Sequence, residues 1–482
     1  MSIWRKKPIS AFEADMKKSD LQRVLGKWSL TAIGIGAIIG GGIFVLTGKV
    51  AHYNAGPALA LSFVVAGIAC VFAALCYAEF ASMLPVEGSA YAYAYGTVGE
   101  IFAWLIGWGL ILEYGMGAMT VAVSWSGYFN KLLGLFGLKI PAEFANAPFD
   151  QNPGYMNVPA FLITWVVTSI LVKGIKEAAS ANNIIVILKV GAVLFVILVG
   201  MFFIKTANWI PFIPEPELIK GEDGAMHQAY GVQGIFAGAA SIFFAYIGFD
   251  AVSTQAGEAI NPKKDMPFAI IASLLICTML YIAVALVLTG MMNYKEFTGE
   301  DLKAPVAAAF QKNGIDWAMY IITAAATAGL ISVMLVMMLG QTRIFLGMAK
   351  DGLLPEFFKA IHNTFKTPFK STILVGLVVS LVAAFAPLTV LGDMTSFGTL
   401  FAFAMVCGAV WLLRIREPNV ERPFKVPALP VIATLGVVVN LLLIFNLDKR
   451  AQLLATGWMA LGVIVYFIYS KRNSNLEKEQ KA

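Results

Sequence analysis

Three consecutive glycines, Gly40, Gly41 and Gly42, lie in the middle of an apolar segment that is long enough to cross a bilayer. The segment covers residues 27–50 and reads KWSLTAIGIGAIIGGGIFVLTGKV. Glycine inside a helix costs roughly 1 kcal/mol relative to alanine, so the run predicts an interruption at membrane depth. Backbone groups freed there are tolerated only where they line a cavity or contact a bound solute. The segment therefore predicts a broken membrane helix beside a solute site.

A second apolar segment, residues 235–255 (IFAGAASIFFAYIGFDAVSTQ), is interrupted by Gly248, about 207 residues after the glycine run. Two interrupted spans at corresponding positions of two halves indicate the binding site of a secondary transporter. The alternative interpretation of these glycines is that small residues allow helices to pack closely. This interpretation suits Gly34 and Gly36, but it does not explain three glycines in a row as well.

The composition indicates a polytopic membrane protein. Of the 482 residues, 59% are hydrophobic and only 13% are charged, whereas soluble domains carry about 25% charged residues. The net charge of +6 lies in the loops between apolar spans, so we expect no nucleic-acid partner. The four cysteines fall in apolar runs and the three histidines are isolated. We therefore expect no metal site, no cofactor and no enzymatic activity.

The hydropathy pattern predicts twelve membrane spans of about 20 residues each. Of the 35 lysines and arginines, 24 lie on the side of the amino terminus and 10 on the opposite side, which predicts that both termini are cytoplasmic. We expect a multi-pass protein of the cell inner membrane. The predicted spans are residues 29–50, 57–83, 98–130, 158–173, 184–204, 231–256, 267–292, 317–346, 371–387, 395–414, 428–446 and 452–470.

The same topology predicts an internal repeat. Spans one to five start on the cytoplasmic side, spans six to ten start outside, and each set begins with an interrupted helix, so the two sets form an inverted repeat. Two further helices follow. The predicted organisation is a cytoplasmic segment 1–28, a transporter core 29–415 with repeats 29–204 and 231–414, two membrane helices in 428–470 and a cytoplasmic tail 471–482.

The two breaks suggest the chemistry of the solute. The half-helix after Gly40–Gly42 presents free N–H groups and the positive end of its dipole, which favour a carboxylate. Carbonyls left free before this break and around Phe244–Ile247 favour an ammonium group. A solute that carries both groups is an amino acid.

Charged residues inside the spans are the next signal, because each costs several kcal/mol at the bilayer centre. Lys189 is surrounded by apolar residues, and since burial favours the neutral form of a lysine, we expect it to exchange a proton. The alternative is a permanently charged lysine paired with an acid. Glu113 is interpreted as a pocket acid, a counter-ion of the lysine or a structural acceptor. Asp250 is expected to cap the half-helix after the second break, and Glu258 to act as a gate or loop anchor.

The chain resembles the amino acid–polyamine–organocation superfamily, and within it a bacterial member of the cationic amino acid transporter family. The resemblance rests on motifs that cover residues 20–415, whereas vertebrate members have fourteen spans rather than twelve. The motifs are GAIIGGGIFVLTG at 36–48, AGPALALSF at 55–63, CYAEFASMLPVEGSAYAYAYGTVGE at 76–100, GWGLILEY at 107–114, FFAYIGFDAVSTQAGEAINPKKDMP at 243–267 and MAKDGLLP at 348–355.

The resemblance implies an all-α leucine-transporter fold with helices 1 and 6 interrupted and substrate held at the breaks. It implies that the substrate carboxylate meets amides at Gly41 and Gly42, and that Lys189 stands where sodium-coupled relatives bind sodium. The candidate substrate site comprises the residues at the two breaks and one acid: Ile38, Gly40, Gly41, Gly42, Ile43, Glu113, Phe244, Ala245, Tyr246 and Ile247.

These observations predict a proton-coupled L-amino acid symporter that works by alternating access. Because Ile38, Ile43, Phe244 and Ile247 are apolar, the expected substrate is small and neutral, such as alanine. Glu113 leaves a cationic substrate, arginine or lysine, as the alternative, since a buried guanidinium needs a carboxylate partner. An amino acid-sensing membrane receptor is a further alternative. We expect partners limited to the amino acid, the proton and membrane lipid, with a monomer as the functional unit.

Overall fold

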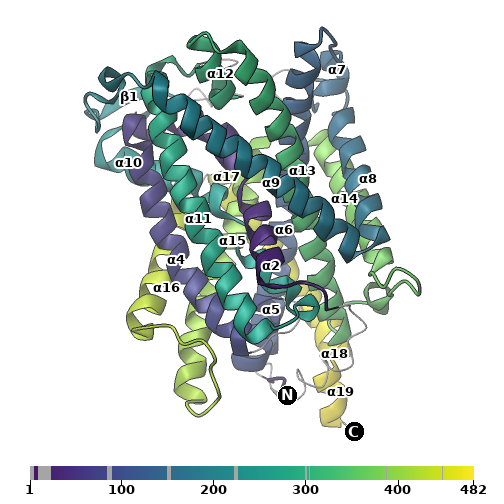
Figure 1. Cartoon of the computed structure of the whole chain (residues 1–482). Helices are drawn as coiled ribbons and strands as arrows, with labels where there is room; N and C mark the ends of the chain where they lie inside the picture. Colours follow the sequence, from purple (N-terminus) through teal and green to yellow (C-terminus); the bar gives the residue numbers. More distant parts are fainter. Residues whose placement is uncertain are drawn as a thin grey trace.

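The computed structural model describes residues 5–8, 23–83, 89–148, 153–221, 226–298, 301–302, 304–386, 388–447 and 449–481. The described chain is a bundle of helices (Figure 1) with one small antiparallel sheet, in which β1 (Glu217–Lys220) pairs with β2 (Met226–Ala229). Eight helical stretches of the described part are long and apolar enough to cross a membrane, and three shorter apolar helices accompany them.

The helices differ in the length of their connections, and the longest connection, between α9 and α10, contains the small sheet. The first of the eight stretches, Lys27–Met83, contains two predicted spans, which are separated near Gly56, where φ is +60°. The principal helices are α2 (Lys27–Ile38), α3 (Thr47–Val50), α4 (Leu59–Met83), α5 (Ala90–Thr97), α6 (Glu100–Leu135), α7 (Ala142–Ala145), α8 (Val158–Lys173), α9 (Ile175–Gly200), α10 (Gly231–Ile242), α11 (Pro262–Met291), α12 (Pro305–Lys312), α13 (Asp316–Lys350), α14 (Phe369–Phe385), α15 (Leu388–Arg416), α16 (Leu429–Phe445), α17 (Lys449–Val465), α18 (Lys471–Asn473) and α19 (Asn475–Lys481).

The first membrane stretch is discontinuous at the glycine run. Helix α2 ends at Ile38, the chain bends at Ile39 and Gly40, and helical geometry resumes in η1 (Gly42–Leu46). The stretch then continues through α3 and η2 (Ala51–Ala55), so the break lies inside one apolar segment.

The sixth predicted span is also discontinuous. Helix α10 passes into the short turn η6 (Phe243–Tyr246) and then, after Gly248, into η7 (Asp250–Glu258). Gly248 has φ +125°, and a Cβ at this position would lie 2.5 Å from the Cβ of Ala37 in α2. Only glycine combines this backbone conformation with such a close approach. The two breaks therefore lie against each other.

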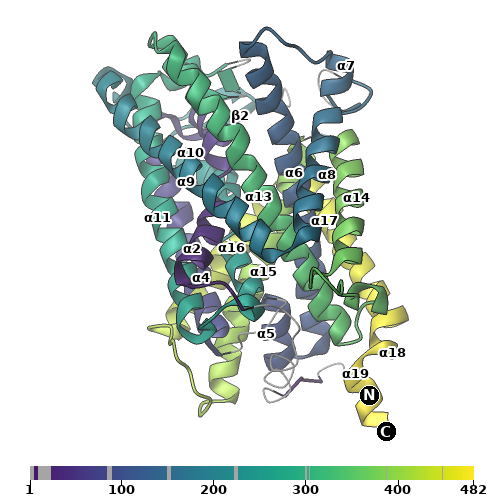
Figure 2. The ribbon, with the colours of Figure 1, turned by 45° about the vertical axis from the view of Figure 1, so that its right-hand side comes forward.

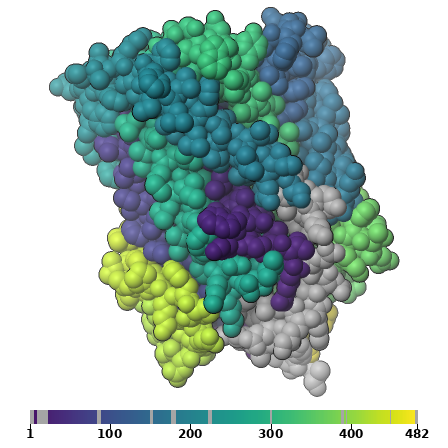
Figure 3. Space-filling view, in the orientation of Figure 1, coloured from purple at the N-terminus to yellow at the C-terminus, as the bar shows by residue number. Residues whose placement is uncertain are grey.

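Long helices surround the two broken segments. Helix α13 packs against α6, α11 packs against α4 and α2, and α15 packs against α6 and α16. Helix α9 crosses this assembly obliquely and contacts α2, α11 and α13 (Figures 1 and 2). In the space-filling view, the start of α2 reaches the surface beside α9 and α11 (Figure 3), where Trp28 is 64% exposed.

Candidate functional site

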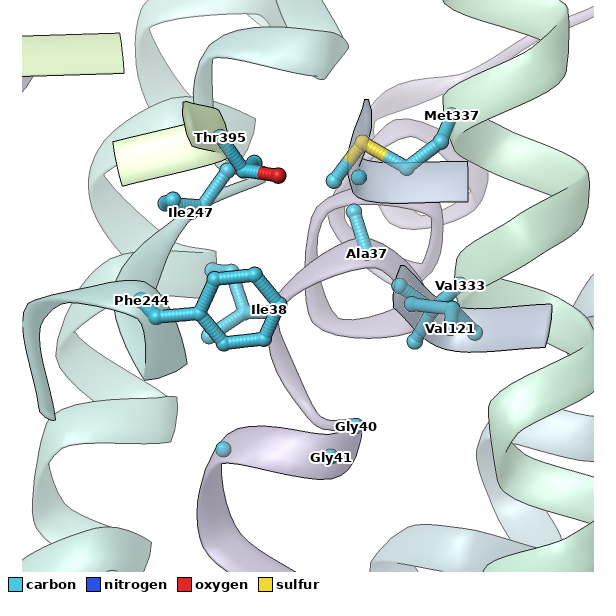
Figure 4. Close-up of a pocket in the computed structure, with 12 residues that line it drawn as sticks. Ala37, Ile38, Gly40, Gly41, Val121, Phe244, Ile247, Val333, Met337 and Thr395 are labelled. Atoms are coloured by element: carbon cyan, nitrogen blue, oxygen red, sulfur yellow. The ribbon is translucent and has the colours of Figure 1, made fainter. Parts of the chain in front are cut away.

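A pocket lies at the junction of the two breaks (Figure 4). The broken segments form one side, while α6, α13 and α15 form the others. Its lining residues are Ala37, Ile38, Gly40, Gly41, Gly42, Gly117, Val121, Phe244, Ile247, Val333, Met337 and Thr395.

The glycine run allows the two breaks to approach closely. A Cβ at Gly42 would overlap the Cα and Cβ of Ala245, whereas a Cβ at Gly41 would have its nearest neighbour, the Oγ of Ser124, at 3.6 Å. The turn η1 is the first one after a break, so its leading N–H groups have no acceptor inside the helix. Gly41 and Gly42 line the pocket, and this turn therefore borders it. The backbone here can receive an anionic group such as a carboxylate.

Carbonyl groups of both breaks converge on one tyrosine. The hydroxyl of Tyr281, in α11, donates to the carbonyl of Ile38 at 2.7 Å and lies 3.0 Å from the carbonyl of Ala245. A carbonyl oxygen has two lone pairs, so each can still accept a bond from a solute ammonium. Sequence reasoning missed Tyr281, although a tyrosine in an apolar helix signals a hydroxyl that needs a buried partner.

The remaining walls of the pocket are apolar. Val121 comes from α6, and Val333 and Met337 come from α13. Thr395, from α15, adds a hydroxyl that already donates to the carbonyl of Leu391 at 2.8 Å. Figure 4 shows the Met337 and Thr395 side chains on the side of the pocket opposite Gly40 and Gly41. These four wall residues were not predicted from the sequence.

Four of the predicted substrate-site residues are absent from the lining set: Ile43, Glu113, Ala245 and Tyr246. Ala245 contacts the glycine run instead, and the hydroxyl of Tyr246 donates to the carbonyl of Phe63 in α4 at 2.8 Å. Glu113 packs against α15, where its Cβ is near Gly398. No charged side chain lines the pocket in the described part of the chain.

Lys189 lies at the first break and is completely buried. Its Nζ donates to the carbonyl of Gly36 at 2.5 Å, to the carbonyl of Ile39 at 2.7 Å and to the hydroxyl of Ser332 at 2.6 Å. These three acceptors match the three N–H donors of an ammonium group. Among the described residues no carboxylate pairs with Lys189, so the alternative of an acid partner finds no support in this geometry.

Two acids lie close to the second break, and both are completely buried. Asp250 is the first residue of η7 and accepts a hydrogen bond from the hydroxyl of Tyr114 at 2.5 Å. Neither carboxyl oxygen of Glu113 has a hydrogen-bond partner in the described part of the chain.

Glu258 ends η7 on the side of the molecule where α2 begins. Its carboxylate pairs with Arg343 of α13 at 2.5 Å, and both side chains are 1% exposed. The sequence singled out Glu258 but did not identify Arg343 as its partner, because the two residues are 85 positions apart.

Comparison with known proteins identifies the family of the chain. A family model described as amino acid permease matches residues 25–469. The chain is 43% identical over 477 residues to a methylthioribose transporter of Bacillus subtilis (strain 168), with 99% of this chain and all of that protein covered. It is also 43% identical over 480 residues to the branched-chain amino acid permease BcaP of the same organism, with 99% of each chain covered.

A more distant relative comes from a plant. Cationic amino acid transporter 2, vacuolar, of Arabidopsis thaliana is 40% identical over 427 residues, which are 88% of this chain and 64% of that protein. The matches therefore include proteins named for three different solutes.

Proposed function

The chain belongs to the amino acid permease family, and we propose that it is a proton-coupled symporter of small neutral L-amino acids that works by alternating access. The family consists of multi-pass membrane transporters, so the chain is a transporter of amino acids and not an enzyme. The observation that carries the finer proposal is the contact of Lys189 with the carbonyls of Gly36 and Ile39, which ties a titratable group to the interrupted helix.

The proposed architecture is the leucine-transporter fold with twelve membrane helices. The stretch Lys27–Met83 counts as two helices, and each of the other seven long stretches counts as one. The three shorter apolar helices complete the twelve. Breaks at Ile39–Gly41 and Ile247–Phe249 then fall in helices 1 and 6 of an inverted repeat formed by residues 29–204 and 231–414. Residues 1–28 and 471–482 would be cytoplasmic, in the cell inner membrane.

The substrate would lie across the junction of the breaks. Its carboxylate would meet amides at Gly41 and Gly42, and its ammonium would meet carbonyls such as that of Ile38. Its side chain would face Val121, Val333 and Met337, which favour an apolar group. Two relatives are named branched-chain amino acid permeases, which supports a neutral substrate. Leucine and isoleucine are therefore tested together with alanine.

Proton coupling would work through Lys189. In its protonated form the ammonium donates to the carbonyl of Gly36 in α2 and to that of Ile39 directly after α2, and it holds this segment in the present state. Loss of the proton to the cytoplasm would remove donors from this contact and allow the helix to move. Proton occupancy and conformation would thereby be linked, as coupled transport requires.

Uptake into liposomes that contain the purified protein tests the proposal. Labelled alanine, leucine, isoleucine, arginine and methylthioribose are offered in sodium-free buffer, with and without an acidic exterior. We expect alanine to accumulate in response to the pH gradient. Accumulation of arginine but not of alanine would instead support the cationic alternative, and binding without accumulation would support a receptor.

A further inference from the structure

We propose that the hairpin of β1 and β2 is a lipid anchor, whose exposed face inserts among the phospholipid headgroups of one membrane leaflet. The hairpin lies at the end of the bundle opposite α19 (Figure 1). Such an anchor needs only the membrane and no particular solute, so it goes beyond the proposed transport.

The pairing of the two strands separates an exposed face from an inner face. Side chains alternate along a strand, and directly paired residues of two strands point to the same side. Leu218 pairs with Gln228, and Lys220 pairs with Met226, so these four residues share one face. All four are exposed, with Leu218 at 68% and Met226 at 61%. Large apolar side chains on the outward face of a sheet indicate an apolar environment there.

The length of α10 places the hairpin at the membrane surface. Substrate sites of secondary transporters lie near the bilayer midplane, and the second break, which borders the pocket, directly follows α10. The twelve residues of α10 span about 18 Å, whereas half of a hydrocarbon core measures about 15 Å. Because β2 ends directly before α10 begins, the hairpin lies at the depth of the headgroups.

This depth also suits the polar groups of the hairpin. A sheet of two strands leaves the outer edge of each strand without a strand partner, and such backbone groups are not tolerated within the hydrocarbon core. Water and headgroups can satisfy them at the surface. Lys220 lies on the exposed face, where its apolar stem can follow the lipid chains while its ammonium meets a phosphate.

The exposed face continues the lipid-facing surface of α10. Val232 and Phe236 of α10 are 64% and 59% exposed, and they lie in a stretch that can cross a membrane. On the other side of the hairpin, Ile210 and Ile213 precede β1 and are 78% and 43% exposed. Exposed apolar side chains thus flank the hairpin on both sides. This continuity favours lipid over a soluble partner as the occupant of the exposed face.

The inner face of the hairpin holds the end of η2, which belongs to the stretch after the first break. The Nε2 of His227 lies 2.9 Å from the carbonyl oxygen of Tyr53. Directly after β2, Tyr230 donates from its hydroxyl to the carbonyl of His52 at 2.8 Å and from its amide to the carbonyl of Asn54 at 2.6 Å. Carbonyls at the end of a helix lack donors within the helix. The hairpin therefore caps η2, and its lipid contact would fix this end of the broken stretch to the membrane.

Spin-label accessibility of the full chain in phospholipid nanodiscs tests the insertion. The four native cysteines are buried, so an introduced cysteine carries the label. Labels in Leu218→Cys and Met226→Cys should collide more often with oxygen, which concentrates in lipid, than with a water-soluble nickel complex. Glu217→Cys is the matched control, because Glu217 lies on the other face of β1 and pairs with Lys295 in exposed surroundings. Its label should collide more often with the nickel complex.

Two outcomes of this measurement would overturn the anchor. One is more frequent collision with the nickel complex than with oxygen at both Leu218→Cys and Met226→Cys. The other is dipolar broadening that disappears on dilution with unlabelled protein, which would identify a second copy of the chain as the occupant.

Amide hydrogen exchange in the same nanodiscs tests the link to η2. In the double variant Leu218→Gln/Met226→Gln, peptides from residues 47–58 should exchange at least about threefold faster, because the cap loses its hold on the membrane. Leu138→Gln is the matched control, since it removes a leucine that is 60% exposed in the connection between α6 and α7, at the same end of the bundle (Figure 1). It should leave this exchange unchanged.

Tyr230→Phe separates the cap from the lipid contact. It removes the hydroxyl that donates to the carbonyl of His52, so the peptides from residues 47–58 should exchange faster while the label at position 218 stays in lipid. Unchanged exchange in the double variant at positions 218 and 226 would overturn the anchoring role of the hairpin. None of these measurements uses an amino acid, so their outcome is independent of the uptake test of the proposed function.

Discussion

The Nζ of Lys189 lies 2.7 Å from the carbonyl oxygen of Ile39, the first residue after α2 ends. The contact joins α9 to the interruption of the first membrane stretch, 150 residues earlier in the chain. A single buried side chain thus joins α9 to the segment that lines the pocket.

Replacing this lysine should uncouple transport from the proton gradient. In Lys189→Ala, uptake of alanine driven by an acidic exterior should fall to background, because no ammonium holds the carbonyls of Gly36 and Ile39. Exchange of labelled for unlabelled alanine without a gradient should persist. Ser332→Ala, which removes one of three acceptors, should give an intermediate effect. Concentrative uptake by Lys189→Ala would show that another residue carries the proton.

The glycine run gives a prediction with an internal control. Gly42→Ala should reduce alanine binding by at least about tenfold, because its Cβ would collide with Ala245 and force the breaks apart. Gly41→Ala should fold and bind within about threefold of the parent, because a Cβ there has ordinary contact distances. Binding is measured by calorimetry or by substrate-dependent thermal stabilisation. Equal affinities of the Gly42→Ala variant and the parent would contradict the proposed carboxylate site.

Side-chain selectivity should depend on Met337. Met337→Ala enlarges the apolar end of the pocket, so leucine should gain about tenfold relative to alanine in competition assays, the size of effect typical of added methylene groups in an apolar pocket. Arginine should remain a weak competitor of both proteins, since no carboxylate lines the pocket within the described residues. Strong displacement of alanine by arginine would favour the cationic alternative.

Glu113 should tolerate a neutral replacement. Both of its carboxyl oxygens are buried without hydrogen-bond partners in the described part, so a glutamine carries no greater charge penalty than a protonated acid. We expect Glu113→Gln to retain pH-driven alanine uptake within about threefold of the parent. Loss of pH-driven uptake with exchange retained would instead assign a proton-carrying role to Glu113.

The sequence alone predicted the class of protein and the places where the helices break. These features are local: a run of glycines weakens a helix wherever it occurs, and a lysine in an apolar span is costly in any fold. Gly40–Gly42, Gly248 and Lys189 could therefore be identified from the residue pattern, and the family model supports the resemblance drawn from their motifs. The assignment of substrate and of proton coupling to these residues stays a prediction.

Only the tertiary structure determined which side chains meet. Tyr281 bonds to Ile38, Ser332 to Lys189 and Arg343 to Glu258, across 243, 143 and 85 positions of the chain. The structure also shows that Thr395 and Met337 line the pocket, whereas Glu113 is absent from the lining residues. Such pairings depend on how the long helices pack, and many registers of apolar helices would satisfy the same hydropathy pattern. Local propensity therefore determines where a membrane helix breaks, whereas packing decides what faces the break.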